Sequence, residues 1–484
     1  MQRKMIKLAT GVAGLLLMAT SAQATLKTEK VTLKGNMQVK YNKLPQAVDS
    51  LSEAFTEGMF YGRFRTNFFY WDWSVENYAT GGKQKDNKNN GAGGSLIYKT
   101  APFKGVSATV GMYTSQNLDF FRMDKSDVKY SKSGKDTFSR YNVITGGHYG
   151  MTVLAQAYLK FDATKKTSVI VGRQMFETVF TKSNDTKMIP NTFDGVTVTS
   201  KDLPKTTIKA AYFAKQKLRD HTSAHDVIAF DPSNKFNQND DSAINKNLTV
   251  ARVGQDNKLI VLSATNKSIK NLKGNVSYVT VPGVVSNLAL EAHYTIPVGS
   301  MKIVPGVRYM IQYDRLNANY GVANLKTNQT NYTNPNSLDS NLLCARIDFK
   351  QGAFLGRLGY SKVADKADII APWRGFPTGG FTRAMAQYNW YANTKTYMLR
   401  AGYDFGKANI LPGFSVMARY AIQDFDDTKP GVQADSNIFH MDLRQHIGKS
   451  SELKFRLGMV DAKPTNGKTD ISYNEYRLEY NYFF

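Results

Sequence analysis

Apolar and polar residues alternate in short segments along most of the chain. In the final ten residues, one set of alternate positions runs from Tyr476 to Phe484 and is apolar or aromatic, while the other set includes Glu475, Arg477 and Glu479. Successive side chains of a β-strand point to opposite faces of the sheet, so this pattern predicts a strand with one apolar and one polar face. The polar face carries charges of both signs, and the chain ends on an aromatic residue.

About eighteen segments of the chain share this two-residue periodicity. Their approximate ranges are 58–70, 92–100, 105–115, 150–161, 167–175, 194–200, 205–217, 258–267, 272–281, 286–296, 300–314, 341–350, 353–363, 396–405, 413–425, 436–447, 451–462 and 471–484. An even number of antiparallel strands returns both chain ends to one side, and a closed sheet has no unpaired edge. The pattern predicts an all-β protein, a closed antiparallel transmembrane β-barrel of about eighteen strands.

The connections between these segments are alternately short and long. Short turns fall at 101–104, 162–166, 201–204, 297–299, 351–352 and 448–450, and long polar stretches fall at 71–91, 116–149, 218–257, 315–340 and 364–395. Outer-membrane barrels have short periplasmic turns and long extracellular loops. Closure also satisfies the backbone hydrogen bonds that lipid leaves without water. We therefore predict a barrel in the outer membrane, with both chain ends on the periplasmic side.

The start of the chain resembles an export signal. Basic residues at positions 3, 4 and 7 precede a short apolar run, and Ala22-Gln23-Ala24 provides a cleavage site. The apolar run is shorter than the roughly 20 residues that a spanning helix needs. We predict a signal peptide at 1–24, a periplasmic segment at 25–57 and the barrel at 58–484. Within the periplasmic segment, residues 47–55 either form a short helix or are disordered.

Composition and charge narrow the function further. The mean hydropathy of −0.40 is too low for a protein that crosses the membrane with helices. Aromatic residues make up 12% of the chain, which is typical of a transmembrane barrel. Cys344 is the only cysteine, so an intrachain disulfide is excluded. The net charge is +24, and removing the three basic residues of the signal leaves 60 basic against 39 acidic residues, or +21. Because no basic run or nucleic-acid motif accompanies this charge, we expect anionic solutes or lipopolysaccharide as partners, and no nucleic acid.

Two sequence motifs resemble the outer-membrane porin D (OprD) family. The stretch Val171-Gly172-Arg173-Gln174 and the stretch 184–195 are similar to the family's G-R-Q strand end and its D-x-R-x-L-P-x-T-F-x-G loop. Lys187 stands where the family usually has arginine, which keeps the charge but not the planar, bidentate group. Weaker similarity occurs at 404–414 and 372–382, and the resemblance extends from about 58 to 484.

The resemblance implies a monomeric or weakly trimeric barrel with eighteen strands. It also implies that the third extracellular loop, here about 176–193, folds inward as a constriction, and that the solutes are small and carry a carboxylate, as amino acids and aromatic acids do. The loop contains Glu177, Lys182, Asp185 and Lys187. Mixed charge at a constriction would contact both ends of a zwitterion; the alternative is a loop packed on the outer rim.

Arginines recur on the predicted polar face of the C-terminal strands. We call these residues the basic row; they are Arg308, Arg346, Arg357, Arg400, Arg419, Arg444, Arg456 and Arg477. Adjacent strands lie about 4.8 Å apart, so the row would line one wall of the pore and favour anionic or zwitterionic carboxylates. The alternative is that each arginine pairs with an acid of the lumen and stiffens the wall. The candidate acids are Asp348, Asp404, Asp442, Glu475 and Glu479.

Metal-binding and catalytic functions have little support in the sequence. His221 and His225 have helical spacing but no third ligand nearby, and His440 and His446 are about 20 Å apart on a strand, so no metal or cofactor is predicted. No serine occupies a G-x-S-x-G motif, as a barrel hydrolase would favour. The chain is therefore predicted to be a porin and not an enzyme, with a barrel hydrolase or a structural or adhesive barrel as the alternatives.

Overall fold

The computed structural model describes residues 31–33, 39–132, 134–231, 244–385, 388–462 and 469–484. The predicted signal peptide, residues 1–24, lies outside the described residues and stays a prediction. None of the described helices is long and apolar enough to cross a membrane.

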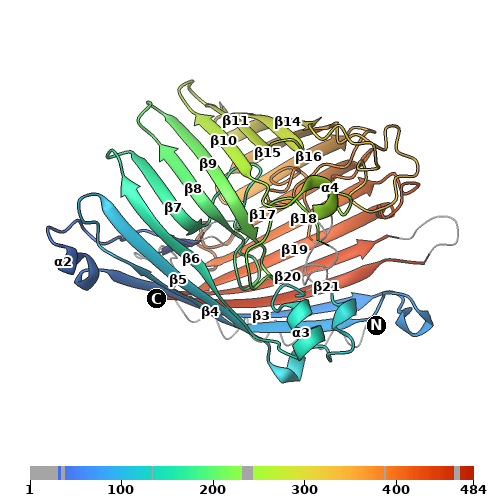
Figure 1. Cartoon of the computed structure of the whole chain (residues 1–484), viewed down its shortest axis with the longest axis horizontal. Coiled ribbons are helices and arrows are strands. Elements are labelled where there is room, and N and C mark those ends of the chain that lie inside the picture. The colour runs from blue at the N-terminus through green and yellow to red at the C-terminus, as the bar shows by residue number, and fades with distance from the viewer. Residues whose placement is uncertain (1–30, 34–38, 133, 232–243, 386–387, 463–468) are drawn as a thin grey trace.

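The described strands form a closed antiparallel barrel (Figure 1). It contains nineteen strand segments among the described residues, and because β12 and β13 both pair with β14, these two act as one interrupted strand and the wall has eighteen. The predicted fold class is confirmed. The bounds are β3 Met59–Trp73, β4 Asn87–Lys99, β5 Val106–Gln116, β6 Met151–Asp162, β7 Thr167–Gln174, β8 Thr192–Ser200, β9 Thr206–Lys217, β10 Leu259–Asn266, β11 Leu272–Val281, β12 Val285–Tyr294, β13 Ile296–Val298, β14 Met301–Asp314, β15 Ser340–Gln351, β16 Phe354–Val363, β17 Lys395–Asp404, β18 Phe414–Asp424, β19 Ser436–Ile447, β20 Ser451–Asp461 and β21 Tyr473–Phe483.

Short elements lie outside the wall. A two-stranded sheet of β1 and β2 and the helix α2 precede the barrel, and the helix shows that part of segment 47–55 is ordered. Ser50 caps α2 by accepting a hydrogen bond from the Glu53 backbone N–H at 3.2 Å. The bounds are β1 Val31–Leu33, β2 Val39–Tyr41, α2 Leu51–Thr56, η2 Tyr78–Thr80, η3 Asp119–Phe121, η4 Val128–Tyr130, α3 Arg140–Gly146 and α4 Val250–Val253.

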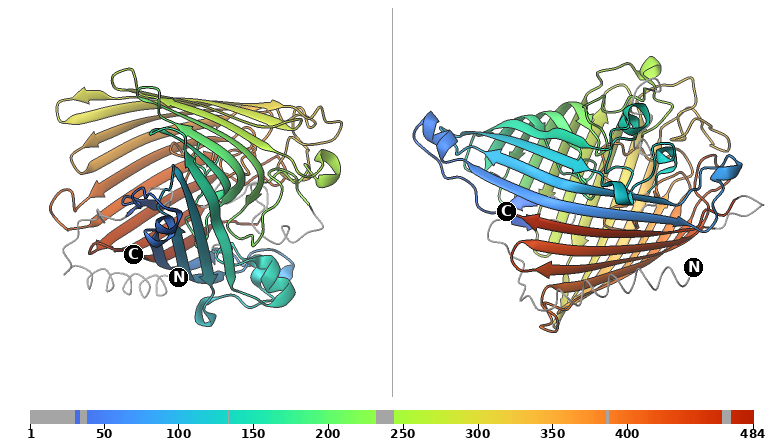
Figure 2. Two further views of the ribbon diagram at one scale, coloured as in Figure 1. Left: turned by 60° about the vertical axis from the view of Figure 1, so that its left-hand side comes forward. Right: turned by 90° about the horizontal axis from the view of Figure 1, so that it is seen from below.

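The connections at one end of the barrel are short and most of those at the other end are long, as the sequence predicted (Figure 2). The predicted and observed strand ends disagree mainly at the end with the long loops. The predicted strand at 92–100 begins at Asn87 instead, because residues 87–91 are polar on both faces and lack alternation. One connection on this side, residues 282–284, is a tight turn rather than a long loop. The periodicity therefore located the membrane-embedded parts of the strands better than their extensions beyond it.

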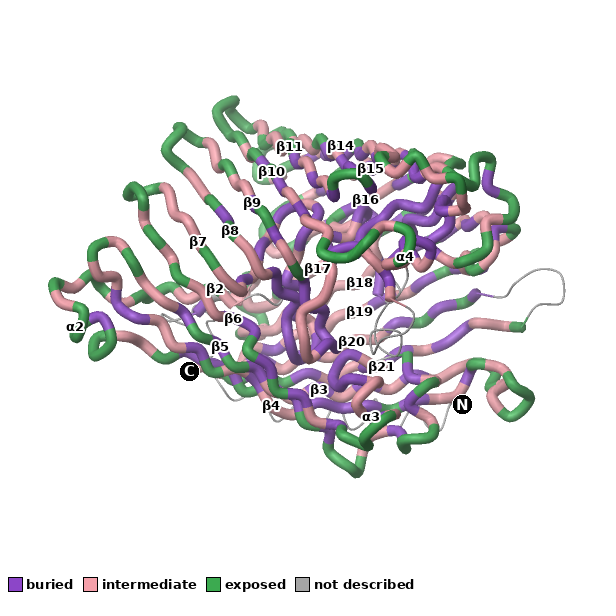
Figure 3. The backbone as a smooth tube through the Cα atoms, viewed as in Figure 1, coloured by how far each residue is buried: buried purple, intermediate pink, exposed green. Residues whose placement is uncertain are grey.

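Alternation along β3 separates an outward apolar face from a buried inward face. The Phe64 side chain points outward and is 62% exposed, whereas Arg63 and Arg65 point inward and are 2% and 1% exposed. Segments far apart in sequence fold into the barrel and bury much of its interior (Figure 3). The largest apolar cluster joins residues of the strands to loop residues such as Phe180 and Trp373.

The pairing of β3 with β21 closes the barrel, and it brings the last residue against a glycine. The Phe484 ring lies 5.3 Å from the Phe64 ring and covers Gly62, where an added Cβ would come within 2.0 Å of the Phe484 Cζ atom. The Gly62 backbone N–H also donates to the Phe484 carbonyl at 3.1 Å. Gly62 thus provides the space in which the terminal aromatic ring packs.

We predict that Gly62→Ala weakens closure of the barrel. The new methyl group must displace the Phe484 ring, at a cost of about 1–3 kcal/mol as for other overpacked sites. The temperature at which the folded form converts to the unfolded form on a denaturing gel should fall. Gly274→Ala is the matched control, because an added Cβ at Gly274 on β11 meets nothing within 4 Å. Equal transition temperatures for the two variants would contradict this role of Gly62.

Candidate functional site

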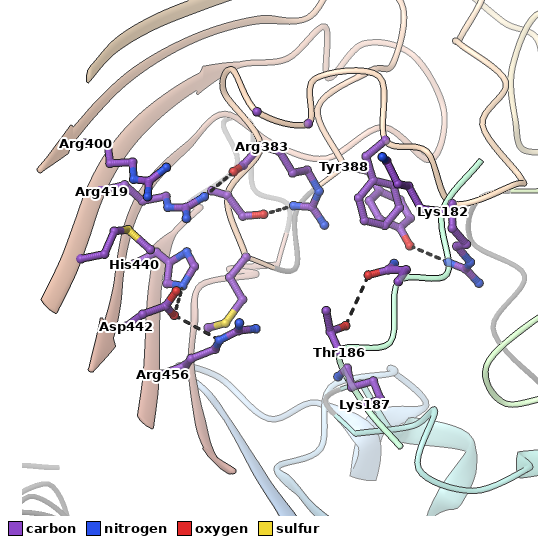
Figure 4. Close-up of a pocket in the computed structure, with 18 of the residues that line it drawn as sticks. Lys182, Thr186, Lys187, Arg383, Tyr388, Arg400, Arg419, His440, Asp442 and Arg456 are labelled. Atoms are coloured by element: carbon purple, nitrogen blue, oxygen red, sulfur yellow. Dashed lines mark hydrogen bonds and ion pairs between the residues drawn. The ribbon is translucent and has the colours of Figure 1, made fainter. Parts of the chain in front are cut away.

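The barrel encloses a polar cavity of about 1410 Å³. Residues of many strands and loops line it. Among them are the connection between β7 and β8 (residues 175–191, the constriction loop), the connection between β16 and β17 (residues 364–394, the late loop) and the inward faces of the C-terminal strands. In Figure 4, Lys182, Thr186 and Lys187 face the strand residues Arg400 and Arg456 across this space. The cavity therefore has loop residues on one side and a basic wall on the other.

The constriction loop is held inside the barrel by Asp185. This carboxylate accepts hydrogen bonds from Arg63 at 2.5 Å and Arg65 at 2.8 Å, and all three side chains are buried. Removing one partner of such a pair is strongly destabilising, because it leaves a buried charge without compensation. The loop thus lies inward, as the resemblance implied, and is not packed on the outer rim.

Three of the four predicted loop residues line the cavity, and Asp185 is the exception. Glu177 forms an ion pair with Lys182 at 3.3 Å, and Lys187 forms one with Asp136 at 3.5 Å. Burial lowers the pKa of the Lys187 ammonium to about 7, and the nearby positive charge of Arg477 adds to this effect. The Lys187 ammonium therefore titrates near neutral pH.

The late loop forms a second inward wall. The sequence alone did not indicate whether this loop enters the pore. Phe376, Gly379, Gly380 and Arg383 of this loop line the cavity. Arg383 was not among the predicted residues, because its surrounding segment shows no strand periodicity that would assign a face. Its guanidinium lies 5.1 Å from the centroid of the Phe376 ring, and burial lowers its pKa to about 10, so it is protonated at neutral pH.

Six residues of the basic row line the cavity, whereas Arg346 and Arg357 do not. Most of the row also pairs with acids, as the alternative interpretation held. The closest ion pairs are Arg308 with Glu291 at 2.5 Å, Arg346 with Asp348 at 3.7 Å, Arg357 with Asp348 at 2.5 Å, Arg444 with Glu452 at 3.2 Å, Arg456 with Asp442 at 3.1 Å and Arg477 with Glu475 at 2.6 Å. The two interpretations do not exclude each other, because four arginines both line the cavity and form an ion pair with an acid. These are Arg308, Arg444, Arg456 and Arg477.

The other two arginines of the row form no ion pair with an acid among the described residues, although the charge of Asp442 acts on both from further away. Arg400 on β17 and Arg419 on β18 lie directly opposite each other in the strand register. Arg419 donates to the Arg383 carbonyl at 2.7 Å, and Arg400 forms no hydrogen bond or ion pair with the described part of the chain. Like charges directly opposite on a sheet are destabilising. An anion beside this pair would therefore reduce the repulsion between the two guanidiniums.

Of the other predicted acids, Asp404 and Glu479 have different roles. Asp404 accepts a hydrogen bond from the Lys407 backbone N–H at 2.9 Å in a turn, and Glu479 lies 3.4 Å from Arg65. The His221 and His225 rings lie 4.7 Å apart, but the described residues include no group of three side chains suited to a metal ion.

Comparisons with known proteins agree with this architecture. Residues 148–255 match the model of a family described as outer membrane porin, OprD family. The fold is similar to the crystal structure of OccK8 (OprE) of Pseudomonas aeruginosa, with a TM-score of 0.68 and 14% identity over 89% of this chain and 99% of that one. It is also similar to OpdK of the same organism, solved with vanillate, with a TM-score of 0.64 and 14% identity over 88% and 98% of the two chains.

A third similar structure comes from another organism. OccAB4 of Acinetobacter baumannii has a TM-score of 0.67 and 15% identity over 88% of this chain and 98% of that one. A search of curated protein sequences found no significant match.

We predict that the ion selectivity of the pore depends on pH through Lys187. With a pKa of about 7, the ammonium is charged below neutral pH and neutral above it. Anion preference, measured as a reversal potential under a salt gradient, should therefore fall as the pH rises from one unit below this pKa to one unit above.

Lys187→Arg is the control for this prediction, because a guanidinium stays charged throughout the range. The variant should show a smaller pH dependence than the wild-type protein. The same pH dependence in both proteins would show that other groups cause it.

Proposed function

We propose, from the premise that this chain is an outer-membrane porin of the OprD family, that its lumen favours passive diffusion of small anionic and zwitterionic solutes that carry a carboxylate. The conclusion depends on one observation above all. Among the described residues that line the cavity, seventeen are lysine or arginine and six are aspartate or glutamate, an excess of eleven basic residues. A narrow pore with walls of one charge sign selects ions of the opposite sign.

The guanidiniums of Arg400 and Arg419, which form no ion pair with an acid among the described residues, are the strongest candidates for transient contact with a carboxylate. Arginine matches carboxylate geometry with two parallel hydrogen bonds. Conduction also requires each contact to be weak enough for release, and the neighbouring arginines provide further sites of the same kind. A carboxylate would thus move along the row by exchanging one guanidinium for the next.

The constriction loop supports the inclusion of zwitterions. Glu177 lines the cavity together with Lys182 and Lys187, so both charge signs face the solute on this side. An amino acid would place its ammonium near Glu177 and its carboxylate near a basic residue. The similar porin OpdK was solved with vanillate, an aromatic carboxylate, which agrees with this solute class.

The same proposal predicts what the outer surface of the barrel contacts. Outward apolar residues contact the lipid of the outer membrane, and basic residues at the long-loop end would contact lipopolysaccharide. A monomer or a weak homotrimer remains the expected oligomeric state.

The test is the reversal potential of single channels in planar bilayers under a salt gradient, with chloride and small carboxylates as anions. The wild-type channel should prefer anions. Arg400→Gln should lower the anion-to-cation permeability ratio by up to about fivefold, because a unit charge about 4 Å away contributes about 1 kcal/mol in water.

Lys362→Gln is the matched control. It removes the same charge from the neighbouring strand β16, but Lys362 lies on the outward face with the exposed residue Leu358, so the ratio should not change. Cation preference in the wild-type channel, or an equal effect of both substitutions, would contradict the proposal.

A further inference from the structure

Four arginines of the basic row contact the backbone of the late loop, and three of them, all except Arg419, contact the same short segment. We propose that Arg308, Arg346 and Arg357 are positioning residues, which hold segment 377–380 of the late loop in place and so set the width of the pore. This inference refines the proposed function, because it separates arginines that position the loop from Arg400, which forms no hydrogen bond or ion pair with the described residues.

The contacts come from three consecutive strands and converge on one short segment. Arg308 on β14 donates from Nη1 to the Pro377 carbonyl at 2.6 Å and to the Gly379 carbonyl at 3.1 Å. Arg357 on β16 donates from Nη1 to the Gly380 carbonyl at 2.6 Å, and Arg346 on β15 donates to the same carbonyl. Charge-assisted hydrogen bonds of this kind are about twice as strong as neutral ones.

Two carboxylates of the wall orient these arginines. Glu291 contacts Arg308 at 2.5 Å, and Asp348 accepts from Arg357 Nε at 2.5 Å and from Nη2 at 2.9 Å. The Asp348 carboxylate engages the edge of the Arg357 guanidinium that carries Nε and Nη2, and Nη1 is left to donate to the loop. The acids of the wall thus fix the direction in which the arginines reach.

The side chains of the loop fit the same arrangement. The buried Phe381 ring lies 4.9 Å from the Arg308 guanidinium and 5.2 Å from that of Arg346. Gly380, which has a φ of +85°, provides the carbonyl that Arg346 and Arg357 share. Next along the chain, Thr382 forms a hydroxyl hydrogen bond of 2.7 Å with Ser361 of the wall.

The position of this segment matters for passage because Gly379 and Gly380 line the cavity. Arg346 and Arg357 do not line it, so their guanidiniums act on the solute through the loop. Loss of an arginine from this set should release the segment and widen the pore, whereas loss of Arg400 should change selectivity at constant width.

The experiment compares Arg357→Gln and Arg308→Gln with Arg400→Gln in single-channel recordings. In the first two variants, the time spent in higher-conductance sublevels relative to the main level should rise by about tenfold, as expected for the loss of a hydrogen bond to a charged group. Arg400→Gln should not produce these sublevels. Conversion of the folded form on heating, followed on a gel, establishes that each variant forms the barrel.

A reversible cross-link separates a positioning role from a general loss of stability. Ser361→Cys and Thr382→Cys, introduced together with Arg357→Gln and Cys344→Ala, would place two thiols where the hydroxyl oxygens are 2.7 Å apart. Oxidation should suppress the added sublevels, and reduction should restore them. Sublevels that persist after the cross-link has formed would overturn the proposal.

Two outcomes keep this inference distinct from the proposed function. If the wild-type channel prefers cations while Arg357→Gln still adds sublevels, the function is wrong and the positioning role stands. If Arg357→Gln lowers anion preference as Arg400→Gln does, without added sublevels, Arg357 contacts the solute and the positioning role is wrong.

Discussion

Lipid cannot hydrogen-bond to the backbone, and this constraint determines the architecture of the chain. Every strand of the wall must pair on both sides, so the first and last strands, β3 and β21, have to meet. Their pairing leaves Gly62 under the ring of Phe484, and the alternation that points Phe64 outward points Arg63 and Arg65 inward. Closure therefore puts charged side chains into the lumen, where water and other charges can solvate them.

Charge inside the barrel is used in two ways. Most inward arginines lie beside a carboxylate, and several also donate to the backbone of loops that fold into the bore. At Asp185 the acid lies on the constriction loop itself, and it attaches this loop to arginines of β3. The wall and the loops are thus joined by the same type of interaction, whereas Arg400 and Arg419 lie opposite each other without an ion pair to an acid among the described residues.

The strands could be predicted from sequence because a two-residue period is a local property of the chain. The constriction loop was predicted only through its motif, and the partner of Asp185 lies more than a hundred residues away, beyond what a local pattern specifies. Parity placed Arg357 and Arg400 on the same inward face, yet their surroundings differ: Arg357 hydrogen-bonds to Asp348 and to the late loop, whereas Arg400 forms no hydrogen bond with the described residues. The inward position of Arg383 gave no signal, since irregular segments carry no periodicity.

The late loop is anchored mainly through its main-chain oxygens, and this has a consequence for how such a pore can diversify. A carbonyl group is present whatever residue occupies the position, so the anchoring by Arg308, Arg346 and Arg357 does not depend on most of the side chains that the loop presents to the bore. Substitutions at positions such as Phe376 or Arg383 can then alter the chemistry of the passage while the loop keeps its path. A fixed frame with an exchangeable lining is a suitable starting point for evolving, or engineering, channels for new nutrients.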